Sequence, residues 1–384
     1  MIDNNNDKNK NRKKVLIAYK FMPQYRVDFF NQLKIELDRQ NIDLQVVYGK
    51  SINVNRKDEI DLDWGIYRKN QILSFSKFTI YWQPITDIIK GQDLVIVEQA
   101  NSLLINYYLI LLRTFGKIKL GFWGHGRNRQ GKQKSFINAF KKFILNKCDY
   151  WFAYTKSVEE YLLLNGVNES KISVVNNCFD TTHLVTLHNS ITQFEVEETQ
   201  KELGITPEDH VAIYCGALYK EKRIDFLLDA AKLIRQKDDK FQLIILGNGP
   251  DKKKVDDFAK QNNWIHPIGS KFNREKSKYF KLVKICLMPG ALGLAALDAI
   301  AMKTPMVIPH LDIHGPEIDY LVHNVNAILT ADNSIDFAEK SIELFQNPTI
   351  LDKLITGCSI STEEITLEKM VASFTEGVIK CLNE

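Results

Sequence analysis

Two glycine-containing turns in the second half of the chain have residue types that suit the binding of a phosphate group. In the run GALYKEKR, over residues 216–223, Lys220, Lys222 and Arg223 place three cations within four positions. The run PGALGL, over residues 289–294, leads into an expected helix. Unpaired N–H groups at a helix start and a nearby ammonium can neutralise a phosphate. The two turns together predict a diphosphate site. The alternatives are that the cations of 216–223 are simply solvated and that 289–294 is a tightly packed turn without a ligand.

Other candidate residues also follow apolar runs. Asp298 stands about one turn into the expected helix, where a carboxylate could accept hydrogen bonds from sugar hydroxyls. His125 lies between two glycines, which let a ligand approach the backbone closely. Tyr25 and Arg26 follow the first apolar run and Glu98 ends the third, so these three are candidates for contacting a ligand. The alternative for His125 is a structural or merely exposed histidine. The alternative for Arg26 and Glu98 is a surface salt bridge.

The elements that must position these residues alternate along both halves of the chain. Short β-rich runs are expected as strands over residues 15–19, 43–49, 93–99, 119–125, 149–155 and 172–177, and over 211–216, 242–250, 285–290, 305–309 and 327–330. Helical patterns separate them. This alternation predicts two doubly wound parallel sheets in series, which bind ligands at the carboxyl ends of their strands.

The expected division has four parts. Residues 1–14 are expected to form a polar tail, 15–190 an N-terminal domain, 191–365 a C-terminal domain and 366–384 a last helix. The polar stretch 185–205 is expected to be the linker.

Composition narrows the function classes. With 384 residues, of which 45% are hydrophobic and 26% charged, the chain is expected to fold rather than to be disordered. Residues 1–190 carry 28 basic and 18 acidic side chains, and residues 191–384 carry 23 basic and 29 acidic ones. The net charge of +4 is therefore the sum of +10 in the first half and −6 in the second. A basic half suits nucleic acid, an anionic membrane or a phosphorylated small molecule. Nucleic acid ranks last because no reader motif is present.

The cysteines and the apolar segments bear on location. Six dispersed cysteines without a Cys-x-x-Cys pair favour a reduced, cytoplasmic chain. The apolar run 103–112 is about half the length that a membrane-spanning helix needs. The helix expected over 135–147 carries apolar residues on one side and lysines elsewhere. It either buries that side in its own domain or rests on the inner face of an anionic membrane.

Five segments, in order, make the chain resemble the retaining glycosyltransferases of family 4, and in particular the capsule and lipopolysaccharide subset with a PGxxGL turn. They are MPQYRVDFFNQL (22–33), GALYKEKRIDFLLDA (216–230), LGNGP (246–250), PGALGLAALDAIAMKTPMVIP (289–309) and HGPEIDYLVHNVNAIL (314–329). The resemblance implies the GT-B fold, with two Rossmann-like domains facing a central cleft and a last helix that crosses back to the first domain.

The resemblance also implies roles for individual residues. Lys222 contacts the diphosphate of a nucleotide-sugar, Asp298 holds the ribose, and His125 stabilises the donor sugar near the reacting carbon. The remaining donor-site residues that it implies are Gly216, Asn248, Gly249, Gly290, Gly293 and Leu294. Two positions depart from the family, because Gly290 replaces a glutamate and Ala217 an arginine. Glu317 is the candidate substitute for the carboxylate, and Lys220 or Arg223 for the guanidinium.

The expected activity is retaining transfer of a hexose-type sugar from a nucleoside-diphosphate sugar to a glycan or lipid-linked acceptor in surface polysaccharide synthesis. The resemblance favours a front-face reaction in which the N-terminal domain binds the acceptor, with Tyr25, Arg26 and Glu98 as candidates, and the C-terminal domain binds the donor. No metal or cofactor is expected, since the sole Asp-x-Asp, at residues 61–63, lies in a polar loop. Two alternatives stay open: a catalytically silent GT-B partner subunit, and a nucleotide-sugar 2-epimerase.

Overall fold

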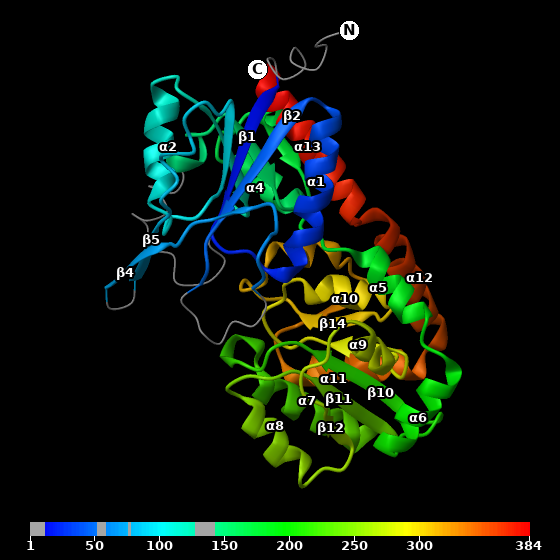
Figure 1. Ribbon diagram of the computed structural model, residues 1–384. Helices are drawn as coiled ribbons and strands as arrows, with labels where there is room; N and C mark the ends of the chain where they lie inside the picture. The colour runs from blue at the N-terminus through cyan, green and yellow to red at the C-terminus, as the bar shows by residue number, and fades with distance from the viewer. Residues whose placement is uncertain (1–11, 52–58, 76–77, 127–142) are drawn as a thin grey trace. The chain divides into compact units, whose positions relative to one another are not determined.

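The computed structural model describes residues 12–51, 59–75, 78–126 and 143–384 (Figure 1). They form two compact units. The first unit contains the described residues up to Phe179 together with Leu367–Glu384, and the second is Asp180–Thr366. Each unit is built on its own parallel sheet.

The first unit has a seven-stranded parallel sheet in the order β3-β2-β1-β6-β7-β8-β9. The strands are β1 (Lys13–Tyr19), β2 (Ile42–Tyr48), β3 (Ile66–Tyr67), β6 (Leu94–Glu98), β7 (Lys119–Gly124), β8 (Tyr150–Ala153) and β9 (Ile172–Val174), and a separate hairpin pairs β4 (Gln71–Phe75) with β5 (Phe78–Trp82). Continuous burial over 15–19 and 94–97 fits a parallel sheet covered on both faces. The order reverses between β1 and β6, so the turns after these strands diverge there.

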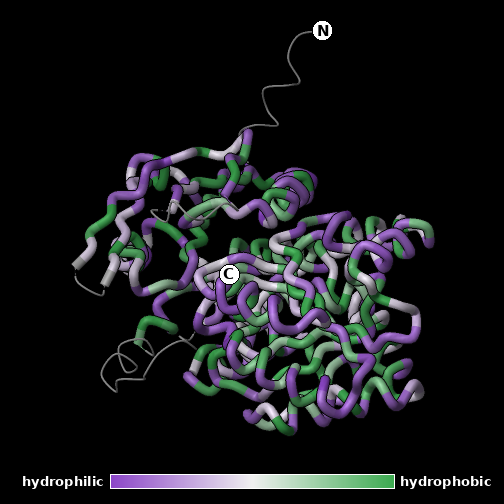
Figure 2. The backbone as a smooth tube through the Cα atoms, turned by 90° about the horizontal axis from the view of Figure 1, so that it is seen from below, coloured by the Kyte–Doolittle hydropathy of each residue, from purple (hydrophilic) through white to green (hydrophobic). Residues whose placement is uncertain are grey.

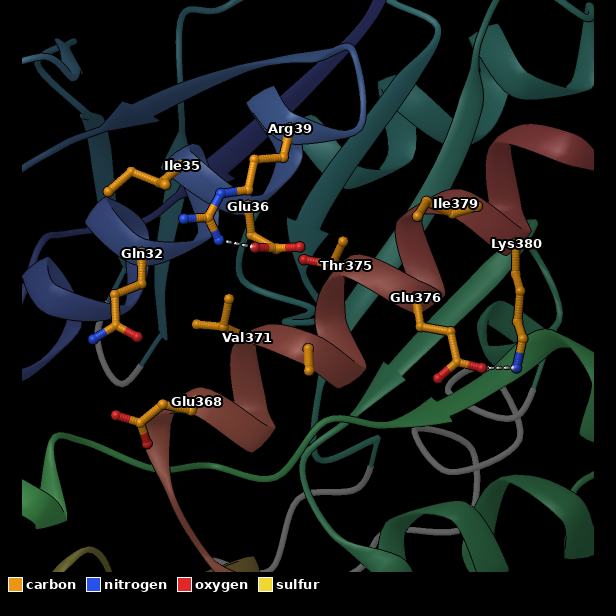
Figure 3. A pocket seen from close by; sticks show the side chains of 11 residues that line it. Gln32, Ile35, Glu36, Arg39, Glu368, Val371, Thr375, Glu376, Ile379 and Lys380 are labelled. Atoms are coloured by element: carbon orange, nitrogen blue, oxygen red, sulfur yellow. Dashed lines mark hydrogen bonds and ion pairs between the residues drawn. The ribbon is translucent and has the colours of Figure 1, made fainter.

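Helices cover this sheet. They are η1 (Gln24–Arg26), α1 (Val27–Arg39), α2 (Ile105–Thr114), α4 (Lys156–Leu164), η2 (Glu169–Lys171) and α13 (Leu367–Asn383). The last helix, α13, packs beside α1 and against β7, β8 and β9 (Figure 1). A groove of about 720 Å³ lies between α1 and α13, with Glu36 paired to Arg39 and Glu376 to Lys380 along its sides (Figure 3).

The second unit has a six-stranded parallel sheet in the order β12-β11-β10-β13-β14-β15. The strands are β10 (His210–Cys215), β11 (Phe241–Leu246), β12 (Ile265–Pro267), β13 (Ile285–Leu287), β14 (Met306–Pro309) and β15 (Ala327–Thr330). The helices are α5 (Thr181–Asn189), α6 (Gln193–Leu203), η3 (Lys220–Lys222), α7 (Ile224–Lys237), α8 (Lys252–Ala259), α9 (Asn273–Phe280), α10 (Ala295–Ala301), η4 (Pro316–Tyr320), α11 (Ser334–Gln346) and α12 (Pro348–Glu364). Hydrophobic stretches lie in the interior of this unit (Figure 2). The two doubly wound sheets predicted from the sequence are confirmed.

The stretch expected to be a linker is helical instead. Within this stretch residues 185–189 belong to α5 and 193–203 to α6, and α5 packs on α9 and α10. Thr192 and Glu195 form a capping box that starts α6. The first unit therefore ends at Phe179 and not near residue 190, because α5 buries its apolar side in the second unit.

Candidate functional site

The two turns predicted to bind a diphosphate meet in the second unit, where the strand order reverses between β10 and β13. Lys222, which is 9% exposed, donates to the backbone carbonyl of Ala291 over 2.5 Å. The amide of Ala291 donates to the carbonyl of Glu221 over 2.8 Å. A Cβ at Gly290 would lie 2.4 Å from the Glu221 carbonyl oxygen. Gly290 is thus required for this close approach of two turns.

Backbone donors line the open part of the second turn. Within the described part of the chain, no group accepts a hydrogen bond from the amides of Gly293, Leu294 and Ala295, and all three residues are partly exposed. A Cβ at Gly293 would meet no atom within 4 Å. Successive unpaired amides form a concavity that suits an anion. The helix that follows, α10, has only seven residues, so these amides contribute more than its dipole.

Glu317 lies near Lys222, although Glu317 follows β14 and Lys222 follows β10. The 3₁₀ helix η4 follows β14, and Glu317 on it is 5% exposed. The amide of Gly315 donates to the Leu292 carbonyl over 2.9 Å, which fixes this loop to the second turn. Burial lowers the pKa of Lys222, and the neighbouring Cys215 and Glu317 partly offset that effect. A buried cation, a buried carboxylate and exposed amides therefore gather at one edge of the sheet.

Asp298 has a partner that sequence reasoning missed. Its Oδ1 lies 2.5 Å from Nζ of Lys276 on α9, and the two side chains are 17% and 14% exposed. Burial alone would lower the pKa of Lys276, but Asp298 and Cys215 raise it overall. No spacing in the sequence relates residues 276 and 298, since their proximity follows from the packing of two helices. A ribose at Asp298 would have to share the carboxylate with Lys276.

The other cations near the site differ in their surroundings. Lys220 is exposed on η3. Arg223 adopts a left-handed conformation with φ of 54°, pairs with Asp332 over 2.6 Å and donates to the Pro289 carbonyl over 3.4 Å. Its guanidinium therefore contacts the start of the 289–294 turn while it is held by a carboxylate.

The turns after β10 and β11 pack backbone against backbone. A Cβ at Gly247 would lie 2.0 Å from the Gly216 carbonyl oxygen, and one at Gly249 would lie 2.3 Å from the Leu218 carbonyl oxygen. Asn248 is exposed, and its side-chain oxygen accepts the Gly249 amide over 2.8 Å. Close packing accounts for Gly247 and Gly249, whereas the exposed Asn248 lies where a ligand could reach it.

In the first unit, His125 and Glu98 lie at the carboxyl edge of the sheet. His125 directly follows β7, is exposed, and its ring meets that of Tyr154 edge-on with centroids 6.1 Å apart. Glu98 ends β6 and accepts the amide of Lys20 over 2.6 Å, which ties β6 to the turn after β1. Tyr25 is half-buried in that turn.

Arg26 departs from its predicted place. The expectation of an acceptor contact or a surface salt bridge is wrong, because the residue is 0% exposed. Its guanidinium donates to the Tyr19 hydroxyl over 3.2 Å and to the side chain of Asn177, and it lies 4.9 Å from the Trp123 ring centroid. Aromatic residues after the strand ends enclose it, and the sequence alone did not indicate this.

Three expectations concern metals and membranes. Across the ranges that the structure describes, no group of three or more His, Cys, Asp and Glu is placed to hold a metal ion. Asp61 pairs with Lys50 over 3.0 Å. The helix expected over 135–147 lies largely outside the described residues. Among the helices that are described, none combines the length and apolarity needed to cross a bilayer.

Comparisons with known proteins agree with this geometry. Residues 195–357 match the family model "Glycosyl transferases group 1". The chain is similar to alpha-monoglucosyldiacylglycerol synthase of Acholeplasma laidlawii, at 27% identity over 47% of this chain and 46% of that one. It is also similar to poly(ribitol-phosphate) alpha-N-acetylglucosaminyltransferase of Staphylococcus aureus, at 28% identity over 52% of this chain and 41% of that one. The match thus spans less than half the length of either relative.

A solved structure shows the fold. HepE of Anabaena, in complex with UDP, superposes with a TM-score of 0.67 at 12% identity, covering 95% of this chain and 99% of that one. The architecture is GT-B, with two Rossmann-like domains. Together, the matches support a GT-B glycosyltransferase.

Proposed function

We propose that this protein is a retaining glycosyltransferase of family 4 that moves a hexose-type sugar from a nucleoside-diphosphate sugar to a glycan or lipid-linked acceptor in surface polysaccharide synthesis. One observation is central to this proposal. The ammonium of Lys222 lies against the Ala291 carbonyl, directly before the unpartnered amides of Gly293, Leu294 and Ala295. This is the arrangement that a diphosphate group needs.

The proposed chemistry follows from charge. As the bond between the sugar and the diphosphate breaks, negative charge grows on the leaving phosphate. Lys222 and the three amides stabilise that charge, because the bond to the Ala291 carbonyl keeps the ammonium beside the turn that carries the amides. In a front-face reaction the leaving phosphate takes the proton of the acceptor hydroxyl. His125 stabilises the sugar, and neither a metal nor a cofactor is needed for these steps.

The remaining residues define the donor and the acceptor. Asp298 accepts hydrogen bonds from the ribose, and Glu317 from sugar hydroxyls in place of the carboxylate absent at Gly290. Tyr25 and Glu98 contact the acceptor at the other sheet. The names of the two relatives, one a glycolipid synthase and one a polymer glycosyltransferase, support a lipid-linked or glycan acceptor. The bound UDP of HepE supports a nucleoside-diphosphate donor.

Calorimetry with UDP and GDP, combined with donor turnover, tests this function in the full chain. Lys222→Ala is expected to weaken nucleotide binding about tenfold and turnover by about 10²–10³-fold, because the contact strengthens as charge develops on the phosphate. Lys237→Ala is the matched control, since Lys237 is 56% exposed and pairs with Glu339 on α11. Unchanged binding and turnover in Lys222→Ala would contradict the proposal.

Gly290 favours one alternative, a silent partner subunit. The backbone of residues 221–222 occupies the space that a side chain at position 290 would need, so the carboxylate typical of the family has no room there. A chain that binds nucleotide but neither hydrolyses nor transfers any nucleotide-sugar would be such a subunit. Turnover by the purified chain excludes it, and a product with an inverted carbon 2 would instead indicate an epimerase.

We also propose a cytoplasmic chain with peripheral contact to the inner face of the membrane. The described end of the segment 135–147 supports this, because Phe143 is 61% exposed and Lys147 lies 4.3 Å from its ring centroid. An apolar ring beside a cation suits an anionic lipid surface. Flotation with anionic and neutral vesicles tests the contact, and equal binding to both would contradict it.

A further inference from the structure

Arg26 occupies an unusual place for an arginine. It is 0% exposed, and among the residues that the structure describes its guanidinium contacts four polar partners: the Tyr19 hydroxyl, the Asn177 side chain, the Cys178 carbonyl over 3.5 Å and the Met370 sulfur over 3.6 Å. None of these partners carries a formal negative charge. Burying a cation in this way is costly, and apolar side chains of similar volume would stabilise the unit at least as well. Stability alone therefore does not account for this arginine.

The rings around the guanidinium lead to His125. Arg26 lies 4.9 Å from the ring centroid of Trp123 and 5.9 Å from that of Tyr154. Trp123 is near the end of β7, two residues before His125. The ring of Tyr154 meets Trp123 at 6.0 Å on one side and His125 at 6.1 Å on the other. Arg26 thus packs against the Tyr154 ring, which contacts His125, and against the Trp123 ring, which contacts Tyr154.

The backbone next to His125 is tied to Tyr154. Gly124 has φ of 150° and Gly126 has φ of 62°, and both values favour glycine. The amide of Tyr154 donates to the Gly124 carbonyl over 3.2 Å, and the Tyr154 ring meets that of His125 edge-on. Tyr154 therefore contacts the His125 segment through both its backbone and its ring.

We propose that Arg26 is a positioning residue that fixes the Trp123 and Tyr154 rings and, through them, holds His125 in its working orientation. This inference rests on the proposed function in one respect: His125 is taken to meet the donor sugar. Arg26 itself touches neither substrate.

A double-mutant cycle in the full chain tests the inference. Arg26→Lys keeps the positive charge but loses the planar fork that reaches several partners at once. We expect it to lower kcat about 10- to 100-fold while UDP affinity stays unchanged, because the nucleotide site is in the second unit. In a His125→Ala background, Arg26→Lys should lower kcat less than about twofold further, since its effect passes through His125.

The control is another arginine of the same unit, on helix α2. Arg113 pairs with Asp149 over 2.8 Å, just before β8, at the end of the sheet opposite to His125. Arg113→Lys is expected to leave kcat unchanged in both backgrounds. If Arg26→Lys reduces kcat equally with and without His125, the two residues act independently and the inference is wrong. Arg26→Met is a second variant to use if Arg26→Lys does not fold.

A second measurement separates this inference from the proposed function. In NMR spectra of protein with isotope-labelled histidine, the His125 signal is the one that His125→Ala removes. Arg26→Lys should shift that signal, and Arg113→Lys should not. If the wild-type chain turns over no donor, the proposed function fails, and the spectra still decide the role of Arg26. A His125 signal that does not move in Arg26→Lys would overturn the inference whatever the activity.

Discussion

Two lysines of the second unit, Lys222 and Lys276, hold their ammonium groups in largely buried surroundings near strand ends. Lys222 bonds a carbonyl, whereas Lys276 pairs with Asp298. Cys215 lies near both, and burial, with the nearby Asp298, raises its pKa to about 12, so the thiol stays neutral. The pairing means that Asp298 both stabilises the unit and, in our proposal, binds the donor.

These two roles of Asp298 can be separated. Asp298→Ala should destabilise the second unit by about 3–5 kcal/mol, because it leaves Lys276 buried without its carboxylate. The double variant Lys276→Met with Asp298→Ala should recover most of that stability but not the donor affinity. Thermal unfolding and the donor KM measure the two effects. A double variant that regained a normal KM would show that Asp298 does not contact the donor.

The sequence indicated part of this site and missed the rest for physical reasons. Lys222 and the 289–294 turn were predicted because each follows a strand, and the ends of neighbouring parallel strands meet. Lys276 was missed because helix packing, and not spacing, brings it to Asp298. Arg26 was placed at the surface because charged residues are usually exposed, and its aromatic surroundings come from segments far apart in the chain.

At the scale of elements, the strands were more predictable than the helices. Buried runs such as 211–214 and 243–246 stand out by their continuous apolar character. The strands β3 and β12 were missed, because β3 has only two residues and β12 contains a histidine and a proline, so neither forms an apolar run. Helices α5 and α6 were taken for a linker because only one side of each is covered, so polar residues outnumber apolar ones.

Helix α5 should make the second unit sensitive to acid. His188 on this helix is buried, and burial together with Lys281 and Lys303 lowers its pKa to about 4 from an ordinary value of 6.5. Between these values the unfolded chain binds a proton that the folded chain does not. The free energy of unfolding should therefore fall as the pH drops below 6.5, by up to about 2 kcal/mol at pH 5.

Urea unfolding at pH 7 and pH 5 measures this effect. His188→Gln should unfold with a smaller difference between the two pH values, whereas His183→Gln, on the exposed side of the same helix, should behave like the wild type. If His188→Gln kept the full pH dependence, another group would be responsible for it.

At the scale of the whole molecule, the last helix belongs to the first unit. Phe374 on α13 stacks on Phe152 with ring centroids 4.4 Å apart and contacts Trp123 at 5.1 Å and Phe29 at 5.3 Å. The core of the first unit therefore includes residues from both ends of the described chain. The sequence resemblance implied this return of the chain, but the aromatic contacts were not predictable without the fold.

Phe374→Ala should destabilise the first unit alone, by about 3–5 kcal/mol, because it opens a cavity in that core. Scanning calorimetry should show one transition at lower temperature and the other unchanged. Phe337→Ala, at a fully buried position of the second unit, is the matched variant and should lower the other transition. A single transition that moved in both variants would show that the two units unfold together.

The return of α13 has a consequence for synthesis on the ribosome. The second unit is complete once Thr366 has emerged, whereas the first lacks part of its core until the final 18 residues follow, since it comprises Leu367–Glu384 as well as the N-terminal portion. Although it is made earlier, the N-terminal sheet is left with Phe29, Trp123 and Phe152 uncovered by Phe374 during most of translation. The nascent chain thus finishes its later-made unit first, and its earlier-made one is the part that chaperones would need to protect.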